Sequence, residues 1–469
     1  MTIETELHAQ VCVVGAGLSG LVAATRLVEA GVEDVVVLEA RDRVGGRLSA
    51  HTRPNGELLM EGGEYTGPPQ AELHELAAQL GIAVEPIPPF ADEESVGSFV
   101  RVFDGERHVE AFPFERDPQG GEALASAVAA LDAMSAEVPA QAPWTAPDAE
   151  ALDFTPVARW LDDHVPSAAA RGYIASDLAY LGDVRGASML QLLGFLAAFG
   201  GWEAHESLVM RFVGGTAQIP ARLAEALGDR VVTGAPVRRV IHDGDGVEVR
   251  HERGVVRAEA VIMAVEPLQA AKLEWVPSLP RMRSTLQTHW TGSHGIKYFA
   301  VYDRPFWRED GLAGVAVAPP PFQLVLDVSE TGSAEGILSA TQFGEAGLIH
   351  GQIEQLADPE TSRRMVLDFL AFCFGEAARS PKELYAFDWN GDGWSTGCGT
   401  VLPLGILTTA GPALRAPVGR IHWAGADAGD MDWMEGAVTA GRRAAAEVLE
   451  ACGTRSRFVE VTDTTREGV

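Results

Sequence analysis

Cysteine is scarce in this sequence of 469 residues. Its four cysteines stand at positions 12, 373, 398 and 452. Such wide separation excludes the close pairing of a zinc site and the dense pattern of a disulfide framework. The sequence therefore predicts a protein of a reducing compartment, and we expect the cytoplasm.

Long apolar runs are also missing. Residues 1–10 are polar and acidic, so we expect no signal peptide. The apolar run 189–199 is too short to cross a bilayer and predicts a buried helix. The end, 454–469, is a short polar tail. We therefore expect no membrane among the partners.

Basic residues are few compared with acidic ones. The chain has 36 lysines and arginines against 66 aspartates and glutamates, a net charge of −30. This balance argues against nucleic acid and anionic membrane surfaces as partners. Lysine is rarer still, with three lysines beside 33 arginines. The length exceeds that of one ordinary core, so we expect two domains.

The clearest motif starts at the first apolar strand. Gly15, Gly17 and Gly20 follow that strand, Ser19 lies among them, and a second apolar strand ends on Glu39. In a dinucleotide-binding βαβ unit these glycines allow a tight turn, an approach of the backbone to pyrophosphate, and close helix packing. The helix N-terminus faces the phosphates. An acid at the position of Glu39 accepts hydrogen bonds from a ribose. The chain is thus predicted to bind a dinucleotide.

The residues that follow carry a resemblance to a known family. Ala40, Arg41, Gly46 and Arg47 belong to a run that continues directly from Glu39. This run resembles LEARxRxGGR, the extended signature of the FAD-containing amine oxidase family. The resemblance implies that these residues lie along the pyrophosphate and the flavin of FAD. The alternative reading is an arginine-rich surface loop.

Later segments extend the resemblance over about residues 11–450. Four later motifs occur in the same order as in the family. They are a GGxYxGP segment, a valine after proline, a tryptophan-rich stretch and an Ala-Gly-x-Asp turn. The resemblance places the following residues at the cofactor: Gly62, Gly63, Glu64, Tyr65, Val237, Trp389, Gly425, Asp427 and Met434. Val237 is a candidate for the adenine edge or an ordinary strand residue. Trp389 could also belong to the core.

Lys297 is the most informative single residue. It is one of only three lysines, and it stands in the apolar run 295–301. A lysine buried there would be costly unless its ammonium were hydrogen-bonded to something specific. In the family, the corresponding lysine holds a water against the flavin N5. The alternative is a strand residue that faces solvent.

Two further positions bear on the cofactor and the substrate. Cys398 matches the cysteine that monoamine oxidases bond to the FAD 8α carbon. Two interpretations stay open, covalent attachment of FAD and an ordinary buried cysteine. Monoamine oxidases flank the amine with two tyrosines, where this chain has Gly399 and Trp433. Trp433 is therefore expected to line the substrate path, and the substrate range of monoamine oxidases is not carried over.

The expected fold is α/β, with a Rossmann-like FAD-binding domain of discontinuous segments and a substrate domain of mixed β-sheet and helices. The FAD-binding domain is expected to comprise 1–81, 210–283 and 389–453, the substrate domain 82–209 and 284–388, and the tail 454–469. Scattered histidines predict no metal site.

The resemblance implies oxidation of an amine C–N bond to an imine, which water hydrolyses to a carbonyl product. FAD would be the cofactor and O₂ the acceptor, giving H₂O₂. Lys297, Cys398 and Trp433 are the catalytic candidates, and a homodimer is a further expectation. Two other functions stay open: a flavin oxidase or desaturase acting on a ring C–N or a C–C bond, and a non-catalytic flavin-binding scaffold.

Overall fold

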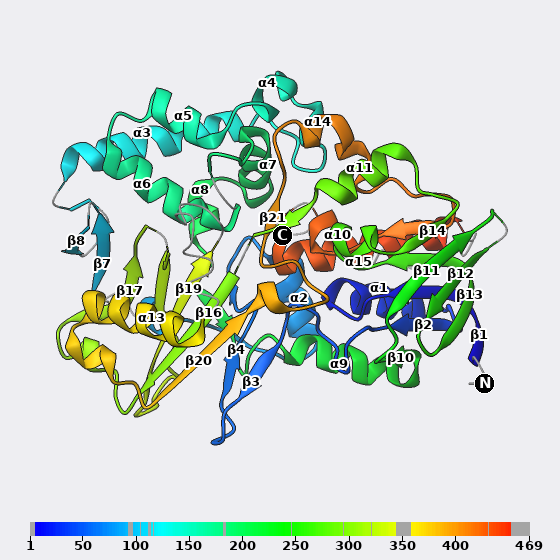
Figure 1. Ribbon diagram of the computed structural model, residues 1–469, viewed down its shortest axis with the longest axis horizontal. Coiled ribbons are helices and arrows are strands. Elements are labelled where there is room, and N and C mark those ends of the chain that lie inside the picture. Colours follow the sequence, from blue (N-terminus) through cyan, green and yellow to red (C-terminus); the bar gives the residue numbers. More distant parts are fainter. Residues whose placement is uncertain are drawn as a thin grey trace, which may run out of the picture.

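The computed structural model describes residues 5–91, 97–103, 105–110, 114–115, 117–181, 184–244, 246–293, 295–319, 321–343, 358–429 and 431–451. The expected tail at 454–469 and Cys452 lie outside these residues. Figure 1 shows a sheet at each end of the molecule, with a layer of helices above the left-hand sheet. The predicted α/β fold is confirmed.

An eight-stranded sheet forms the right-hand part of Figure 1. Its strands run in the order β10-β2-β1-β13-β12-β11-β14, and β22 also pairs with β13. Their bounds are β1 (Thr5–Val14), β2 (Val35–Leu38), β10 (Val231–Val232), β11 (Val237–His242), β12 (Val247–His251), β13 (Gly254–Met263), β14 (Glu274–Val276) and β22 (Ile421–Trp423). The central strands β2, β1 and β13 are parallel. Their apolar side chains are buried on both faces, as parallel sheets require.

Two helices from opposite ends of the chain pack beside this sheet. Helix α1 (Leu18–Glu29) and helix α15 (Trp433–Ala451) contact each other along small side chains. A Cβ at Gly441 would lie 2.4 Å from the carbonyl oxygen of Ser19, so only glycine permits this crossing. Close packing of α1 on α15 thereby brings the first glycine motif next to the C-terminal segment.

A seven-stranded sheet forms the left-hand part, in the order β20-β16-β19-β18-β17-β7-β8. Its strands are β7 (Ser98–Phe103), β8 (Glu106–Glu110), β16 (Gly295–Tyr302), β17 (Leu312–Val317), β18 (Leu324–Asp327), β19 (Gly336–Phe343) and β20 (Glu383–Asp388). Strand β16 pairs with β19 and β20 and is buried along its whole length. Helix α13 (Pro359–Phe374) covers one face with Val366, Leu370 and Phe374.

A helical layer with its own hydrophobic core lies above this sheet in Figure 1. It contains α3 (Pro118–Ser135), α4 (Ala149–Asp153), α5 (Val157–His164), α6 (Ala168–Asp177), α7 (Met189–Phe199), α8 (Trp202–Glu206) and α14 (Ile406–Ala410). Helix α7 is the apolar run that the sequence predicts as a buried helix, and its bounds agree with that prediction. Eight of its eleven residues are buried, so it forms the centre of the layer.

The remaining elements are short and connect the larger parts. They are β3 (Ala50–Thr52), β4 (Leu58–Met60), β5 (Tyr65–Thr66), β6 (Val84–Pro86), β9 (Met210–Phe212), β15 (Thr291–Gly292), β21 (Thr400–Val401), α2 (Ala71–Gln79), α9 (Gln218–Leu227), α10 (Pro267–Ala271) and α11 (Arg281–His289). Within the described ranges, no helix is both long and apolar enough to cross a membrane. The domain boundaries stay a prediction.

Candidate active site

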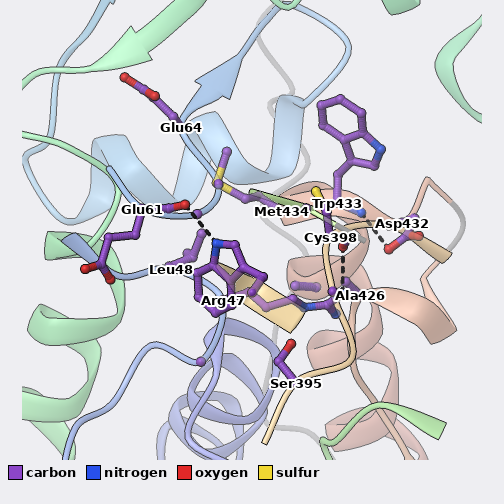
Figure 2. Close-up of a pocket in the computed structure, with 18 of the residues that line it drawn as sticks. Arg47, Leu48, Glu61, Glu64, Ser395, Cys398, Ala426, Asp432, Trp433 and Met434 are labelled. Carbon is purple, nitrogen blue, oxygen red and sulfur yellow. Dashed lines mark hydrogen bonds between the residues drawn. The ribbon is translucent and has the colours of Figure 1, made fainter. Parts of the chain in front are cut away.

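One cavity of about 1000 Å³ runs from the glycine motif of the eight-stranded sheet to the seven-stranded sheet and the helical layer. It is lined by residues separated by more than 400 positions, among them Gly15 and Ala437. Figure 2 shows part of it, with Trp433, Cys398 and Asp432 on one side and Glu61 and Glu64 on the other. Long-range folding thus gathers the sequence motifs around one space.

The glycine motif forms one wall as predicted. Gly15 has a φ of 106°, and a Cβ there would lie 2.5 Å from the carbonyl oxygen of Ala264, so the turn needs glycine. A Cβ at Gly20 would lie 2.0 Å from the carbonyl oxygen of Gly15, which confirms its packing role. At Gly17 a Cβ would meet no protein atom within 4 Å. The space in front of Gly17 therefore belongs to the cavity, and it is the place where the sequence predicts the pyrophosphate of the dinucleotide.

Helix α1 begins at this wall without a side-chain cap. The backbone N–H of Gly425 donates to the Ser19 hydroxyl over 2.8 Å, which joins the motif to the turn after β22. Glu39 is 3% exposed, and its carboxylate accepts from the backbone N–H groups of Ala16 and Arg41. These bonds hold the carboxylate at the end of β2, and each oxygen keeps a lone pair for a ribose hydroxyl.

The two predicted arginines lie in the cavity with carboxylate partners. Arg41 donates to Asp392 over 2.6 Å. Arg47 donates to Asp427 over 3.0 Å and to the carbonyl oxygen of Cys398 over 3.1 Å, and its Nε lies 3.4 Å from Glu266. Burial alone would lower the pKa of Arg47, but Asp427 and Glu266 raise it above its usual range. Arg47 is therefore a permanent cation that ties three distant segments together.

Of the Gly62-Gly63 pair, Gly62 is needed by the protein itself. A Cβ at Gly62 would lie 1.8 Å from the carbonyl oxygen of Arg47, and one at Gly63 would lie 2.7 Å from Leu48. The indole of Trp389 donates to the carbonyl oxygen of Glu61 over 2.8 Å and so stands beside this pair. Both glycines line the cavity, but at Gly62 the backbone of Arg47 already accounts for the absence of a side chain.

Lys297 is buried, as the apolar strand predicts, and it is 7% exposed. Its Nζ donates to the carbonyl oxygen of Met60 over 2.9 Å and forms an ion pair with the carboxylate of Glu64. It also lies 5.3 Å from the ring centroid of Tyr65. The alternative of a solvent-facing strand residue is therefore wrong. Glu64, named from the sequence as a cofactor residue, is the counter-ion of Lys297.

Cys398 and Trp433 line the same cavity. Cys398 is exposed, in contrast to the buried Cys12 and Cys373. Although the side chain is accessible from the cavity, the protein groups around it limit solvation of the thiolate and raise the pKa of the thiol, while Arg47 acts in the opposite direction. Figure 2 shows Trp433 standing over Cys398. The Trp433 ring centroid lies 6.0 Å from that of Phe199 and 6.4 Å from that of His205, so Trp433 borders the helical layer.

The backbone is strained at this border. Asp432 and Trp433 have φ values of 57° and 56°, a region that residues other than glycine adopt at a cost. The Asp432 carboxylate accepts from the N–H of Trp433 over 2.9 Å. Burial and, second, the charge of Asp427 raise the pKa of Asp432. Strain of this kind is typical of positions whose geometry serves a ligand.

Most residues named from the sequence meet in this cavity. It is lined by Gly15, Gly17, Ser19, Glu39, Ala40, Arg41, Gly46, Arg47, Gly62, Gly63, Glu64, Tyr65, Val237, Lys297, Trp389, Cys398, Gly425, Asp427, Trp433 and Met434. Gly20 is the exception, because it serves packing. Sequence reasoning missed Glu266, Asp177 and Glu206, which also line the cavity. Glu266 lies three residues after the end of β13 and could have been found as the first polar residue after that strand.

The cavity fits the predicted dinucleotide. An open space before Gly17, an uncapped helix N-terminus and a fixed Glu39 carboxylate offer what a pyrophosphate and a ribose require. The ribose acid lies at the end of the strand next to the glycine turn. Lys297, Cys398 and Trp433 line the other end of the cavity, where they would contact the reacting part of the cofactor.

Comparison with known proteins identifies the family. The sequence profile of the flavin-containing amine oxidoreductases matches residues 18–449. The chain is 34% identical to putrescine oxidase from Kocuria rosea, over 96% of both chains. It is 32% identical to an L-amino acid dehydrogenase from Synechocystis, over 93% of this chain and 94% of the relative.

Solved structures agree with the sequence comparison. A putrescine oxidase bound to putrescine superposes with a TM-score of 0.87 at 32% identity, over 95% of this chain and all of that one. Cyclohexylamine oxidase from Brevibacterium oxydans gives a TM-score of 0.85 at 29% identity, over 95% and 99%. The chain therefore belongs to the flavin-containing amine oxidoreductases and is an FAD-dependent enzyme that oxidises an amine C–N bond.

Proposed function

We propose that the chain oxidises a neutral amine to an imine in the cavity around Lys297, with O₂ as the final acceptor. Bound FAD would supply the oxidation by accepting a hydride equivalent from the amine carbon. H₂O₂ leaves as the second product, and water hydrolyses the imine to the carbonyl compound. The observation that carries the proposal is the position of Lys297, Cys398 and Trp433 in the cavity that the glycine motif also lines.

Lys297 would orient a water molecule in the cavity. Two acceptors, Met60 and Glu64, hold its Nζ, which leaves one of its three N–H groups for a further partner. Because Lys297 is buried, a water molecule can reach this third N–H group only from the cavity. The role proposed for Glu64 is to fix the ammonium in place, so Glu64 is a positioning residue.

Trp433 would form one wall of the amine's path. Its ring packs against the rings of Phe195, Phe199 and His205. Its backbone N–H donates a hydrogen bond to the Asp432 carboxylate. Gly399 also lines the cavity and leaves room where monoamine oxidases carry a tyrosine. A wall with one large ring and one open position suits a flexible aliphatic amine better than a flat aromatic one.

The FAD would be held by the glycine motif, Glu39, Arg41, Arg47 and the turn at Gly425. Val237 lines the cavity at its first sheet and stays the candidate for the adenine edge. Covalent attachment through Cys398 is also a proposal. Its support is that Cys398 is the exposed member of the three cysteines in the described part of the chain and faces the cavity.

Location and assembly complete the proposal. Cys12, Cys373 and Cys398 are free thiols, which supports a reducing compartment such as the cytoplasm. The enzyme would work as a homodimer, and light scattering of the purified holoenzyme checks this by its mass.

The proposal is tested by peroxide release. The holoenzyme is incubated with primary, secondary and cyclic amines in air, and H₂O₂ is measured with Lys297→Met as the comparison. We expect H₂O₂ with at least one amine and a loss of at least about tenfold in rate in the variant, since one well-placed polar contact accounts for a tenfold effect or more. A non-catalytic flavin scaffold would release none.

A further inference from the structure

One large aromatic side chain of the cavity is not part of the hydrophobic core. Trp394 lines the cavity and is half-buried. Its ring belongs to none of the five hydrophobic clusters of the described residues, whereas Trp275 and Trp423 of the eight-stranded sheet pack together in one of them. Packing within the protein therefore does not account for a tryptophan at position 394.

The indole N–H of Trp394 also differs from that of the neighbouring tryptophan. Trp389, in the same segment, donates its indole N–H to the carbonyl oxygen of Glu61 over 2.8 Å and is thereby fixed to the protein. Within the part of the chain that the structure describes, the indole N–H of Trp394 has no hydrogen-bond acceptor. A tryptophan that serves packing usually finds one. Trp394 thus lacks both features that hold a structural tryptophan, a hydrophobic cluster and a bonded N–H.

Arg238 covers one face of this ring. Its guanidinium carbon lies 5.2 Å from the centroid of the Trp394 ring, a distance at which a cation is attracted to the face of an indole. The Arg238 guanidinium is itself fixed by two hydrogen bonds, of 2.5 and 3.1 Å, to Glu252. Among the described residues, no other ring or cation packs on the indole. Its second face is therefore left without an aromatic or cationic partner from the protein.

Two hydrogen bonds place Trp394 beside the predicted ribose site. The Asp392 Oδ1 atom accepts from the backbone N–H of Trp394 over 2.7 Å and from the guanidinium of Arg41 over 2.6 Å. The backbone N–H of Arg41 donates in turn to the Glu39 carboxylate over 2.9 Å. Trp394 is thus joined, through one carboxylate and one arginine, to the acid that would bind the ribose.

The same end of the cavity contains the candidate for the adenine edge. Val237 directly precedes Arg238 in β11, and both line the cavity with Trp394. The backbone N–H of Ala235 donates to the carbonyl oxygen of Glu39 over 2.8 Å, which keeps the start of β11 next to the ribose acid. Because adenine is bonded directly to the ribose of FAD, the adenine ring would lie in the space that Glu39, Val237 and Trp394 surround.

We propose that Trp394 stacks on the adenine ring of FAD, while Arg238 packs on the opposite face of the indole. Stacking suits this pair because both rings are flat and present π-faces to each other. Stacking of a base on an aromatic side chain contributes about fivefold to a hundredfold in affinity. Arg238 acts through the indole and is a positioning residue. The inference rests on the proposed position of FAD in this cavity, with its ribose at Glu39.

The test measures the preference of the holoenzyme for FAD over FMN, which lacks the AMP half of FAD. Every protein carries Cys398→Ala, so that the flavin can exchange even if the wild-type chain attaches it. The holoenzyme is equilibrated with mixtures of FAD and FMN, and the bound flavins are quantified by chromatography. We expect Trp394→Leu to lower the ratio of FAD affinity to FMN affinity by about fivefold to a hundredfold. A general loss of flavin affinity leaves this ratio unchanged.

Two variants separate stacking from other roles of the side chain. Trp394→Phe keeps an aromatic face but has no N–H group, so it should retain the ratio within roughly threefold. Trp275→Leu is the matched control, because Trp275 is a half-buried tryptophan of the eight-stranded sheet that does not line the cavity. It should leave the ratio unchanged.

The inference is overturned if Trp394→Leu lowers the affinities for FAD and FMN equally, which would indicate a structural role. It is also overturned if Trp394→Phe loses the preference as fully as Trp394→Leu, which would indicate a bond from the indole N–H. Neither result bears on amine oxidation, because exchange of the flavin needs no amine. Failure of the proposed function would appear instead as a holoenzyme that prefers FAD as predicted but releases no H₂O₂ with any amine.

Discussion

The ion pair between Lys297 and Glu64 allows the clearest calculation. Each side chain is 8% exposed, so neither charge is well solvated without the other. Removing one member of a buried pair leaves an uncompensated charge and costs about 3–5 kcal/mol. Lys297→Met and Glu64→Leu should each lower the free energy of unfolding by that amount. Replacing both charges with apolar side chains is often nearly neutral, so the double variant should be more stable than either single one.

The measurement is urea unfolding of the holoenzyme, followed by circular dichroism for the wild type, both single variants and the double variant. Lys382→Met is the matched control, since Lys382 also pairs with a carboxylate, Glu335, but is 49% exposed. An exposed pair contributes about 0–1 kcal/mol, so this variant should behave like the wild type. If the losses of the two single variants simply add in the double variant, Lys297 and Glu64 do not form the pair described.

Three further predictions concern the cofactor and Asp177. Acid precipitation should leave the yellow colour with the wild-type chain and release it from Cys398→Ala; release from both would show that FAD is not attached through Cys398. Gly17→Ala should keep the wild-type unfolding midpoint of the apoprotein yet weaken FAD binding at least about tenfold, because the added Cβ meets only the cavity. Gly20→Ala should instead lower the unfolding midpoint itself. An FAD affinity of Gly17→Ala equal to that of the wild type would contradict the cofactor's position. Because the pKa of Asp177 is raised, ionisation of its carboxyl destabilises the fold progressively as pH rises from about 4 to about 7. The free energy of unfolding of Asp177→Asn in urea should therefore exceed that of the wild type at pH 8 by on the order of 2–4 kcal/mol, and should not exceed it at pH 4. An equal difference at both pH values would refute the assignment.

Local signals in the sequence were sufficient for the nucleotide half of the cavity. Gly15, Gly17, Gly20 and Glu39 lie within one βαβ unit, and their roles follow from turn geometry and spacing. Lys297 could be predicted as buried because its strand is apolar on both faces. In both cases the neighbours that decide the role lie close in the chain.

The substrate half could not be read in the same way. Asp177 and Glu206 are the last residues of two helices, and an acid at such a position is usually solvated. Only tertiary packing, in which His205 of α8 contacts Trp433 and approaches Asp177, turns them into cavity residues. The bond between Arg47 and Asp427 spans 380 positions, and no local pattern indicates it. The sequence places the Gly62-Gly63 pair at the cofactor, whereas an added Cβ at these positions would first meet Arg47 and Leu48.

The most direct test of the account is a single turnover without oxygen. The holoenzyme is mixed anaerobically with 1,5-diaminopentane and with pentylamine, and the visible absorption band of the flavin is followed. The account predicts that the band bleaches with an amine and that admitting O₂ restores it with one H₂O₂ per flavin. A flavin that dithionite bleaches but no amine bleaches would contradict the central claim that this cavity oxidises amines.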